Sequence, residues 1–308
     1  MPCEKLELLG GGAHGIVFLS QYYNPPTFSV PMKLTVKSSK VEFSGSLWRE
    51  AQILRKLQRC PYIIQCLGED TSIEHGNTVY NLLLEYALGG TLKRLMNSRE
   101  GFIPGDEASL YAYQLLKGIL EVHRHGFVHC DLKPNNILIF PCRCGCGFNK
   151  LKIGDFRLSK VAGEGGHQGA LLYTSPESLF CGMHEAPKDI WAIGCMVAEM
   201  MAGESPWRFC NGDDDKLVQD MASKQPQIPT GISDHAKDFL MKCFERNPNV
   251  RWTADKLLNH PFVANTHNPL LCQRWEDHQA LGNRPFGTSS IGLFSTPISP
   301  CTCTCGKE

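Results

Sequence analysis

The chain has 308 residues, 42% of them hydrophobic, and its 31 Lys and Arg residues balance 31 Asp and Glu residues. The charge balance argues against a basic nucleic-acid-binding surface, and the hydrophobic content argues against wholesale disorder. No apolar run reaches the roughly 18 residues of a transmembrane helix, and the N-terminus lacks the pattern of a secretory signal. We therefore expect an intracellular protein, cytoplasmic or nuclear, that binds neither membranes nor nucleic acid.

The first third of the sequence is rich in predicted strands. Strands are expected at 6–10, 15–20, 33–38, 63–68 and 78–85. In the third of these, Leu34 and Val36 alternate with polar residues, so they should point to one face of a sheet. A short helix is expected at 47–58.

From about residue 90 the spacing of apolar residues becomes helical. It predicts a helix that Asp106 caps and that Gly126 ends. Residues 190–198 are almost entirely apolar, which predicts a helix buried on all sides. Further helices are expected near 213–223, 234–244 and 253–259. Residues 282–308 are rich in Gly, Ser, Thr and Pro and predict a disordered tail.

A glycine-rich segment, Leu9 to Val17, contains the pattern G-x-G-x-x-G-x-V. A dinucleotide-binding turn would lead from a strand into a helix. Here Gly15 leads into the strand-like Ile-Val-Phe-Leu, which favours a hairpin between two strands. Glycines suit such a hairpin when its backbone N–H groups must approach phosphate oxygens.

Seven further motifs follow in order along the chain. They are Thr35-Val36-Lys37, Glu50, His129-Cys130-Asp131-Leu132-Lys133-Pro134-Asn135-Asn136, Asp155-Phe156-Arg157, Ser175-Pro176-Glu177, Asp189-Ile190-Trp191 and Arg251. In this order and spacing, residues from about 6 to about 263 resemble a eukaryotic protein kinase catalytic domain. Weaker signals, such as Gly89-Gly90-Thr91-Leu92 and His260-Pro261-Phe262, resemble plant MEKK-like MAP kinase kinase kinases.

The resemblance implies an α+β, bilobal protein kinase fold. A small, mainly antiparallel β lobe with one key helix would cover about 1–87, and a larger, mainly α lobe about 88–265. Residues 266–308 would form a largely disordered extension. The implied reaction is transfer of the ATP γ-phosphoryl group to Ser or Thr of a protein, with a MAP kinase kinase as the substrate. ATP and Mg²⁺ are the implied cofactors, and the resemblance leaves the oligomeric state open.

The resemblance also implies a role for individual residues. It assigns to the nucleotide site Gly10, Gly12, Gly15, Val17, Lys37, Leu84, Glu85, Ala87 and Leu138. Within that set, Lys37 holds phosphates and pairs with Glu50, Leu84 is the gatekeeper, and Glu85 and Ala87 offer backbone groups to adenine. Asn136 and Asp155 would hold Mg²⁺, since oxygen ligands suit a hard cation. Asp131 would accept the proton of the substrate hydroxyl, and Lys133, typical of serine/threonine kinases, would neutralise charge near the γ-phosphate.

Other motif residues are interpreted as structural. His129 and Phe156 are expected to pack around the site, and Glu177 and Arg251 to form a buried pair.

Four residues depart from the family pattern: Thr35, Cys130, Arg157 and Ala170 replace Ala, Arg, Gly and Thr respectively. None of these changes removes a group that handles ATP, Mg²⁺ or the substrate proton. An active kinase is therefore favoured, and a pseudokinase that acts as an ATP-binding scaffold is the alternative. Cys130 cannot grip a phosphate as an arginine does, and residues 160–172 contain no Ser, Thr or Tyr. Activity is therefore expected not to depend on activation-loop phosphorylation, as in a non-RD kinase.

Two cysteine clusters and two phosphorylation motifs complete the sequence. The clusters are Cys142/Cys144/Cys146 and Cys301/Cys303/Cys305. Their C-x-C-x-C spacing does not match the C-x₂₋₄-C pairs of structural zinc sites, which favours an oxidisable loop over a zinc site, although thiolate clusters can bind soft metals. Thr296-Pro297 and Ser299-Pro300 are of the kind that MAP kinases phosphorylate, so feedback onto the tail is a further hypothesis.

Overall fold

The computed structural model describes residues 3–12, 15–22, 32–142, 148–165, 169–182, 184–210 and 212–264. The chain divides into two compact units between Leu88 and Gly89. We call residues 3–88 the β-rich unit, and residues 89–141 and 149–264 the helical unit. Within the described part of the chain, no helix is long and apolar enough to cross a membrane. Cys144, Cys146, the second cysteine cluster and the tail motifs lie outside the described residues.

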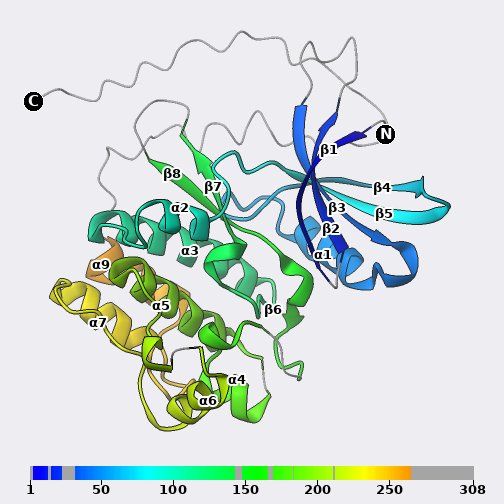
Figure 1. The fold of residues 1–308 in the computed structure, drawn as a ribbon. Coiled ribbons are helices and arrows are strands. Elements are labelled where there is room, and N and C mark those ends of the chain that lie inside the picture. The colour runs from blue at the N-terminus through cyan, green and yellow to red at the C-terminus, as the bar shows by residue number, and fades with distance from the viewer. Residues whose placement is uncertain are drawn as a thin grey trace, which may run out of the picture. The chain divides into compact units, whose positions relative to one another are not determined.

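The β-rich unit is built on one antiparallel five-stranded sheet with strand order β1-β2-β3-β5-β4 (Figure 1). The strands are β1 (Cys3–Gly12), β2 (Gly15–Tyr22), β3 (Met32–Lys40), β4 (Cys66–Glu74) and β5 (Asn77–Glu85). After the short 3₁₀ helix η1 (Val41–Phe43), helix α1 (Gly45–Lys56) contacts β4 and β5. The predicted β lobe with one helix is confirmed.

Alternation along β3 separates the two faces of this sheet. Leu34 and Val36 are buried in a cluster with Tyr22 and Leu83. Because side chains alternate along a strand, Lys37 points to the other face.

One predicted strand is misplaced. The stretch at 63–68 was expected to be a strand because of its apolar residues, but β4 starts only at Cys66 and runs on through polar residues to Glu74. Ile63 and Ile64 are buried before the strand begins. Hairpin pairing with β5, rather than hydrophobicity, therefore determines where β4 lies.

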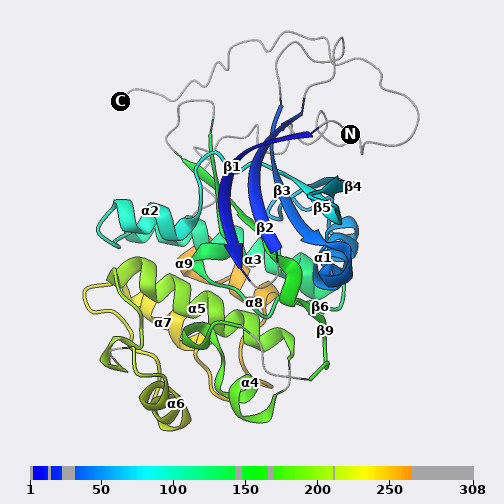
Figure 2. The ribbon, with the colours of Figure 1, turned by 45° about the vertical axis from the view of Figure 1, so that its right-hand side comes forward.

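The helical unit contains most of the described helices and two small sheets (Figures 1 and 2). Its described helices are α2 (Leu92–Ser98), α3 (Gly105–Arg124), α4 (Pro176–Cys181), α5 (Ala186–Ala202), α6 (Asp214–Ser223), α7 (Asp234–Cys243), α8 (Ala254–Leu258) and α9 (Pro261–Ala264). The sheets pair β6 (Phe127–Val128) with β9 (Lys160–Val161), and β7 (Ile137–Pro141) with β8 (Asn149–Ile153). Short 3₁₀ helices are η2 (Pro134–Asn136), η3 (Phe156–Leu158), η4 (Leu171–Tyr173) and η5 (Arg208–Cys210).

Helix α5 forms the centre of this unit and contacts α3 and α7. Every residue from Lys188 to Met201 is buried, as the apolar sequence predicted. At Gly194 an added Cβ would lie 2.6 Å from the Cys243 Cβ, so glycine allows α5 and α7 to pack closely.

Helix α3 differs from the prediction at its start. Pro104 occupies the N-cap position, the helix begins at Gly105, and Asp106 lies in the first turn. A carboxylate in the first turn still favours the helix, because it faces the positive end of the helix dipole. Gly126, with φ of 73°, follows the C-cap and ends the helix as predicted.

Candidate active site

The glycine-rich segment forms the hairpin between β1 and β2. Gly12 pairs with Gly15 across the hairpin, and Gly10 pairs with Val17. A Cβ added at Gly10 would meet nothing within 4 Å, so this strand has open space beside it. At Gly15, where φ is 124°, a Cβ would lie 2.5 Å from the Ser38 carbonyl oxygen. Glycine is therefore required where β2 passes close to β3.

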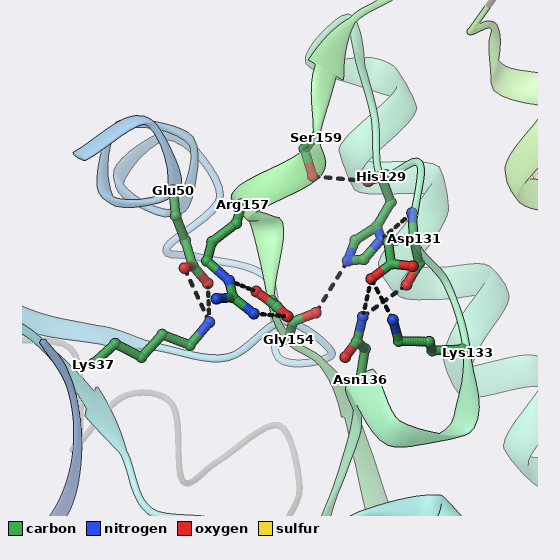
Figure 3. Close-up of polar contacts among 10 residues, drawn as sticks. Lys37, Glu50, His129, Asp131, Lys133, Asn136, Gly154, Arg157 and Ser159 are labelled. Carbon is green, nitrogen blue, oxygen red and sulfur yellow. Dashed lines mark hydrogen bonds and ion pairs between the residues drawn. The ribbon is translucent and has the colours of Figure 1, made fainter. Parts of the chain in front are cut away.

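Lys37 of β3 is joined to Glu50 of α1 by a two-pronged ion pair. Its ammonium donates to the two carboxylate oxygens at 2.7 and 2.9 Å (Figure 3). The Glu50 side chain is fully buried and that of Lys37 is 12% exposed. A buried carboxylate requires such a partner, because leaving the charge unpaired costs several kcal/mol, about 3–5 in measured cases. The pair therefore holds the Lys37 ammonium in one position.

The end of β5 carries the residues assigned to adenine. Leu84 is buried and pairs with Thr35 of β3. The Glu85 N–H donates to the Gln65 carbonyl at 3.1 Å, and the Glu85 carboxylate accepts from the Gln65 N–H at 2.8 Å. These two bonds hold the backbone in place just before Ala87, which is also buried.

In the helical unit, Asp131 lies in the loop that follows β6. Its Oδ2 accepts from the Lys133 ammonium at 2.7 Å and from the Asn136 Nδ2 at 2.9 Å (Figure 3). Its Oδ1 accepts from the backbone N–H of Ala170 at 3.1 Å. The Asp131 side chain is 6% exposed, so three donors hold a nearly buried carboxylate in one orientation.

Asp155 is held near Asn136 by the backbone. The N–H of Gly154, the residue before Asp155, donates to the Asn136 carbonyl at 2.9 Å. Leu138 packs against the same glycine, since a Cβ added at Gly154 would lie 3.0 Å from the Leu138 Cδ1. The Asp155 carboxylate accepts from the Arg157 guanidinium, with Nε at 2.6 Å from one oxygen and Nη2 at 2.8 Å from the other.

His129 connects the Asp131 loop to the Asp155 turn. Its Nε2 donates to the Gly154 carbonyl at 3.0 Å, and its own carbonyl accepts from the Ser159 hydroxyl at 3.1 Å (Figure 3). Its ring packs edge-on against Phe156 at 4.8 Å between centroids, and both side chains are fully buried. These contacts agree with the structural roles expected for His129 and Phe156.

Asp189, in the first turn of α5, binds the backbone of the loop that carries Asp131. It accepts from the backbone N–H of His129 at 2.8 Å, from that of Cys130 at 3.1 Å, and from His123 at 3.0 Å. Burial alone would raise the pKa of Asp189, but the hydrogen bond and charge of His123 lower it overall. A charged, fully buried carboxylate thus anchors the segment that carries Asp131.

Cys130 lies beside Asp131 with a positive φ of 70° and is 2% exposed. Burial, together with the nearby Asp189 carboxylate, raises the pKa of its thiol to about 12. The position where the family has an arginine therefore carries a neutral group.

The part of the chain between Asp155 and Glu177, which we call the activation segment, contacts the Asp131 loop through its backbone. Ala170 supplies the N–H that binds Asp131, although its side chain lacks the hydroxyl of the usual threonine. The preceding Gly169 has φ of 101°, and a Cβ there would overlap the Cys130 carbonyl oxygen. Farther along, the Tyr173 hydroxyl donates to Glu199 of α5 at 2.5 Å.

Glu177 and Arg251 form the expected pair. The Arg251 Nη1 and Nη2 donate to the two Glu177 oxygens at 2.6 and 3.0 Å. Arg251 also donates to the Pro187 carbonyl at 2.8 Å and lies over the Trp191 ring. Its side chain is fully buried, so it serves to tie α4 to α5 and has no access to a substrate.

Sequence reasoning did not identify three of these contributors: Asp189 as the anchor of the loop, the Ala170 N–H and the Arg157 side chain as a partner of Asp155. Asp189 had one usable signal, because an acidic residue ahead of a wholly apolar helix will be buried and must have partners. The Ala170 contact involves only backbone, so the residue type gave no signal.

The chain is similar in sequence to known protein kinases. The family described as protein kinase domain matches residues 3–263. Mitogen-activated protein kinase kinase kinase 20 of Arabidopsis thaliana is 37% identical over 246 residues, which are 76% of this chain and 70% of that protein. Mitogen-activated protein kinase kinase kinase 17 of the same plant is 35% identical over 86% of this chain and 70% of its own length.

Mitogen-activated protein kinase kinase 7 of Arabidopsis thaliana is also similar, at 30% identity over 84% of both chains. The family match thus covers nearly all of the described residues and spans the kinase motifs from Gly10 to Arg251. The chain belongs to the protein kinase family and is a serine/threonine protein kinase.

Proposed function

We propose that this kinase transfers the γ-phosphoryl group of ATP to a Ser or Thr hydroxyl of a MAP kinase kinase. The observation that carries the proposal is the arrangement around Asp131, whose carboxylate is oriented by Lys133, Asn136 and the Ala170 N–H. The choice of substrate is supported by the plant MAP kinase kinase kinases to which the chain is similar.

The residues present fit ATP. Phosphoryl transfer needs positioning and charge neutralisation more than covalent chemistry. Lys37 is a cation fixed by Glu50, and the Gly10 strand has room beside it. Val17, which lies between Gly10 and Lys37 in the sheet, belongs to the same surface.

The residues also fit Mg²⁺. Asn136 turns its amide nitrogen toward Asp131, so its Oδ1 faces away from that carboxylate. Together with the Asp155 carboxylate it supplies the hard oxygen donors that Mg²⁺ prefers, and Mg²⁺ commonly takes only one or two protein ligands beside phosphates and water. When bound, the ion would neutralise charge on the phosphates.

Asp131 is the group suited to the substrate proton. Its two oxygens are fixed by donors, so a hydroxyl that binds to it would be oriented toward the phosphoryl group. Lys133, bonded to the same carboxylate, adds a positive charge at the place where negative charge is transferred.

The test is a kinase assay of the full chain against a panel of MAP kinase kinases with Mg·ATP, beside the Asp131→Asn variant. We expect phosphorylation of at least one panel member and a fall of about 100-fold or more in Asp131→Asn. Each panel member should also be tested with its activation-segment Ser and Thr residues replaced by Ala, which should remove the signal. Nucleotide binding without any transfer would favour the pseudokinase alternative.

A further inference from the structure

Arg157 stands where the kinase family has a glycine, and its side chain binds the Asp155 carboxylate. The guanidinium and the carboxylate form the parallel, two-bond arrangement that is the strongest geometry for this pair of groups. A guanidinium is charged at every physiological pH. Asp155, the proposed Mg²⁺ ligand, therefore already has a cationic partner supplied by its own chain.

The backbone around Asp155 and Arg157 is fixed in a conformation that brings their side chains together. Asp155 has the left-handed conformation (φ 62°, ψ 70°), and Arg157 follows within the 3₁₀ helix η3. The turn is anchored on both sides, by Gly154 bonded to His129 and by Ser159 bonded to the His129 carbonyl. Little backbone freedom has to be lost when the two side chains meet, in contrast to a pair between flexible surface residues.

Partial burial strengthens the pair. The side chains of Arg157 and Asp155 are 23% and 20% exposed. Charges that are largely removed from solvent are screened less by water and salt than exposed ones. The pair can still open, because neither side chain is fully enclosed.

We propose that Arg157 is a tethered competitor of Mg²⁺ for the Asp155 carboxylate, so that this kinase needs a higher Mg²⁺ concentration to bind nucleotide than it would without the arginine. Arg157 has to release Asp155 before that carboxylate can ligate a cation. The apparent affinity for the cation falls by the fraction of molecules in which the carboxylate is released. If the pair is formed about nine-tenths of the time, the half-saturating Mg²⁺ concentration rises about tenfold.

This inference rests on the proposed function, because it takes Asp155 as the Mg²⁺ ligand. The experiment therefore measures binding as well as its dependence on Asp155. A fluorescent, non-hydrolysable ATP analogue is titrated into the full chain at a series of buffered free Mg²⁺ concentrations. The free Mg²⁺ that gives half of the increase in affinity is compared among variants.

Arg157→Gln and Arg157→Ala should each lower the half-saturating Mg²⁺ about tenfold, while the affinity measured without Mg²⁺ stays unchanged. Arg157→Lys keeps the charge but not the two-bond geometry and should give an intermediate value. Arg208→Gln is the matched control, because Arg208 forms a partly exposed ion pair with Glu204 in the same unit. This control should behave as the wild type.

Two results would overturn the inference. One is the same half-saturating Mg²⁺ in Arg157→Gln and the wild type. The other is a lower affinity of Arg157→Gln without Mg²⁺, which would mean that the guanidinium binds phosphate instead. Asp155→Asn separates these outcomes from a failure of the proposed function: if it keeps the full Mg²⁺ effect, Asp155 is not the ligand and the site assignment itself is wrong.

Discussion

At the scale of single residues, the ion pair between Lys37 and Glu50 links stability to the proposed phosphate contact. Lys37→Met should lower kcat/KM for protein phosphorylation about 100-fold or more, because it removes a positioned cation. It should also destabilise the protein, because it leaves the fully buried Glu50 carboxylate without this ammonium. Both effects are measured by steady-state kinetics and thermal unfolding.

The double variant Lys37→Met/Glu50→Gln separates these two effects. It should recover much of the lost melting temperature, since no buried charge is left, but none of the activity. Lys5→Met is the matched control, because Lys5 forms a partly buried ion pair with Glu74 in the same unit. Normal phosphorylation by Lys37→Met would refute the assignment of Lys37.

Cys130 provides a prediction about pH. Burial raises the pKa of its thiol to about 12, so the reactive thiolate is scarce at neutral pH and grows only as the pH approaches that value, well above the ordinary thiol pKa of about 8.5. Cys130 should therefore resist iodoacetamide at pH 7.5 in the folded protein, whereas the exposed Cys181 reacts. Peptide mass spectrometry after timed labelling measures both. Equal labelling rates would show that Cys130 is accessible and ionised.

At the scale of elements, the contact between the activation segment and the Asp131 loop depends on a glycine. Gly169→Ala would place a Cβ against the Cys130 carbonyl oxygen at a φ of 101°, and such strain costs about 1–3 kcal/mol. The segment should shift and weaken the bond from the Ala170 N–H to Asp131. We expect kcat/KM to fall about tenfold or more.

Gly231→Ala is the control for this variant. Gly231 also has a positive φ, 76°, but a Cβ there would meet nothing within 4 Å. It should cost some thermal stability without the specific loss of activity. Similar kinetics in both variants would mean that the close approach at Gly169 does not orient Asp131.

The elements themselves show what the sequence can and cannot predict. The buried helix α5 was predictable because its apolar residues cover every face of the helix. The start of β4 was not predictable. Ile63 and Ile64 are buried in the core before the strand begins, whereas the mostly polar residues after them pair with β5. Hydrophobicity reports burial, and strand pairing is a separate property.

In the candidate site, too, some contacts could be predicted from the sequence and others could not. Glu177 and Arg251 could be expected to pair because both belong to motifs with a known order. The bond from the His129 N–H to the Asp189 carboxylate joins residues 60 positions apart, and only the folded chain brings them together. The Asp155–Arg157 contact depends on a left-handed backbone at Asp155. The presence of an Asp in a sequence does not predict this conformation.

At the scale of the whole molecule, the activation segment is held by hydrogen bonds to other parts of the chain. The four hydroxyls of the segment are all engaged. Ser159 donates to the His129 carbonyl, Thr174 to the Ala170 carbonyl, Tyr173 to Glu199 and Ser175 to the Ser178 hydroxyl. Ser159 and Thr174 are buried as well. Residues 160–172 contain no hydroxyl group at all.

The place that would receive a loop phosphate is also changed. Cys130 is neutral where the family has an arginine. Lys160 and Lys188 lie near enough to Cys130 to affect the pKa of its thiol. Lys160 donates to the Gly165 carbonyl and Lys188 to His184, and both lysines are at least nine-tenths buried. Neither of these two lysines is therefore a surface cation that could receive a phosphate on the described part of the segment.

We accordingly expect specific activity to change less than about twofold when the purified kinase is treated with a phosphatase and intact-mass measurement confirms complete dephosphorylation. A charge-assisted switch would change it far more, because ordering a loop by a phosphate creates several strong hydrogen bonds. Heat-inactivated phosphatase is the control, and Thr174→Ala is measured alongside to separate loss of the Ala170 bond from loss of a phosphate. A large fall after dephosphorylation, mapped to Ser159 or Thr174, would show that the segment is ordered by phosphate after all. Unchanged activity would leave abundance or a binding partner as the means of control.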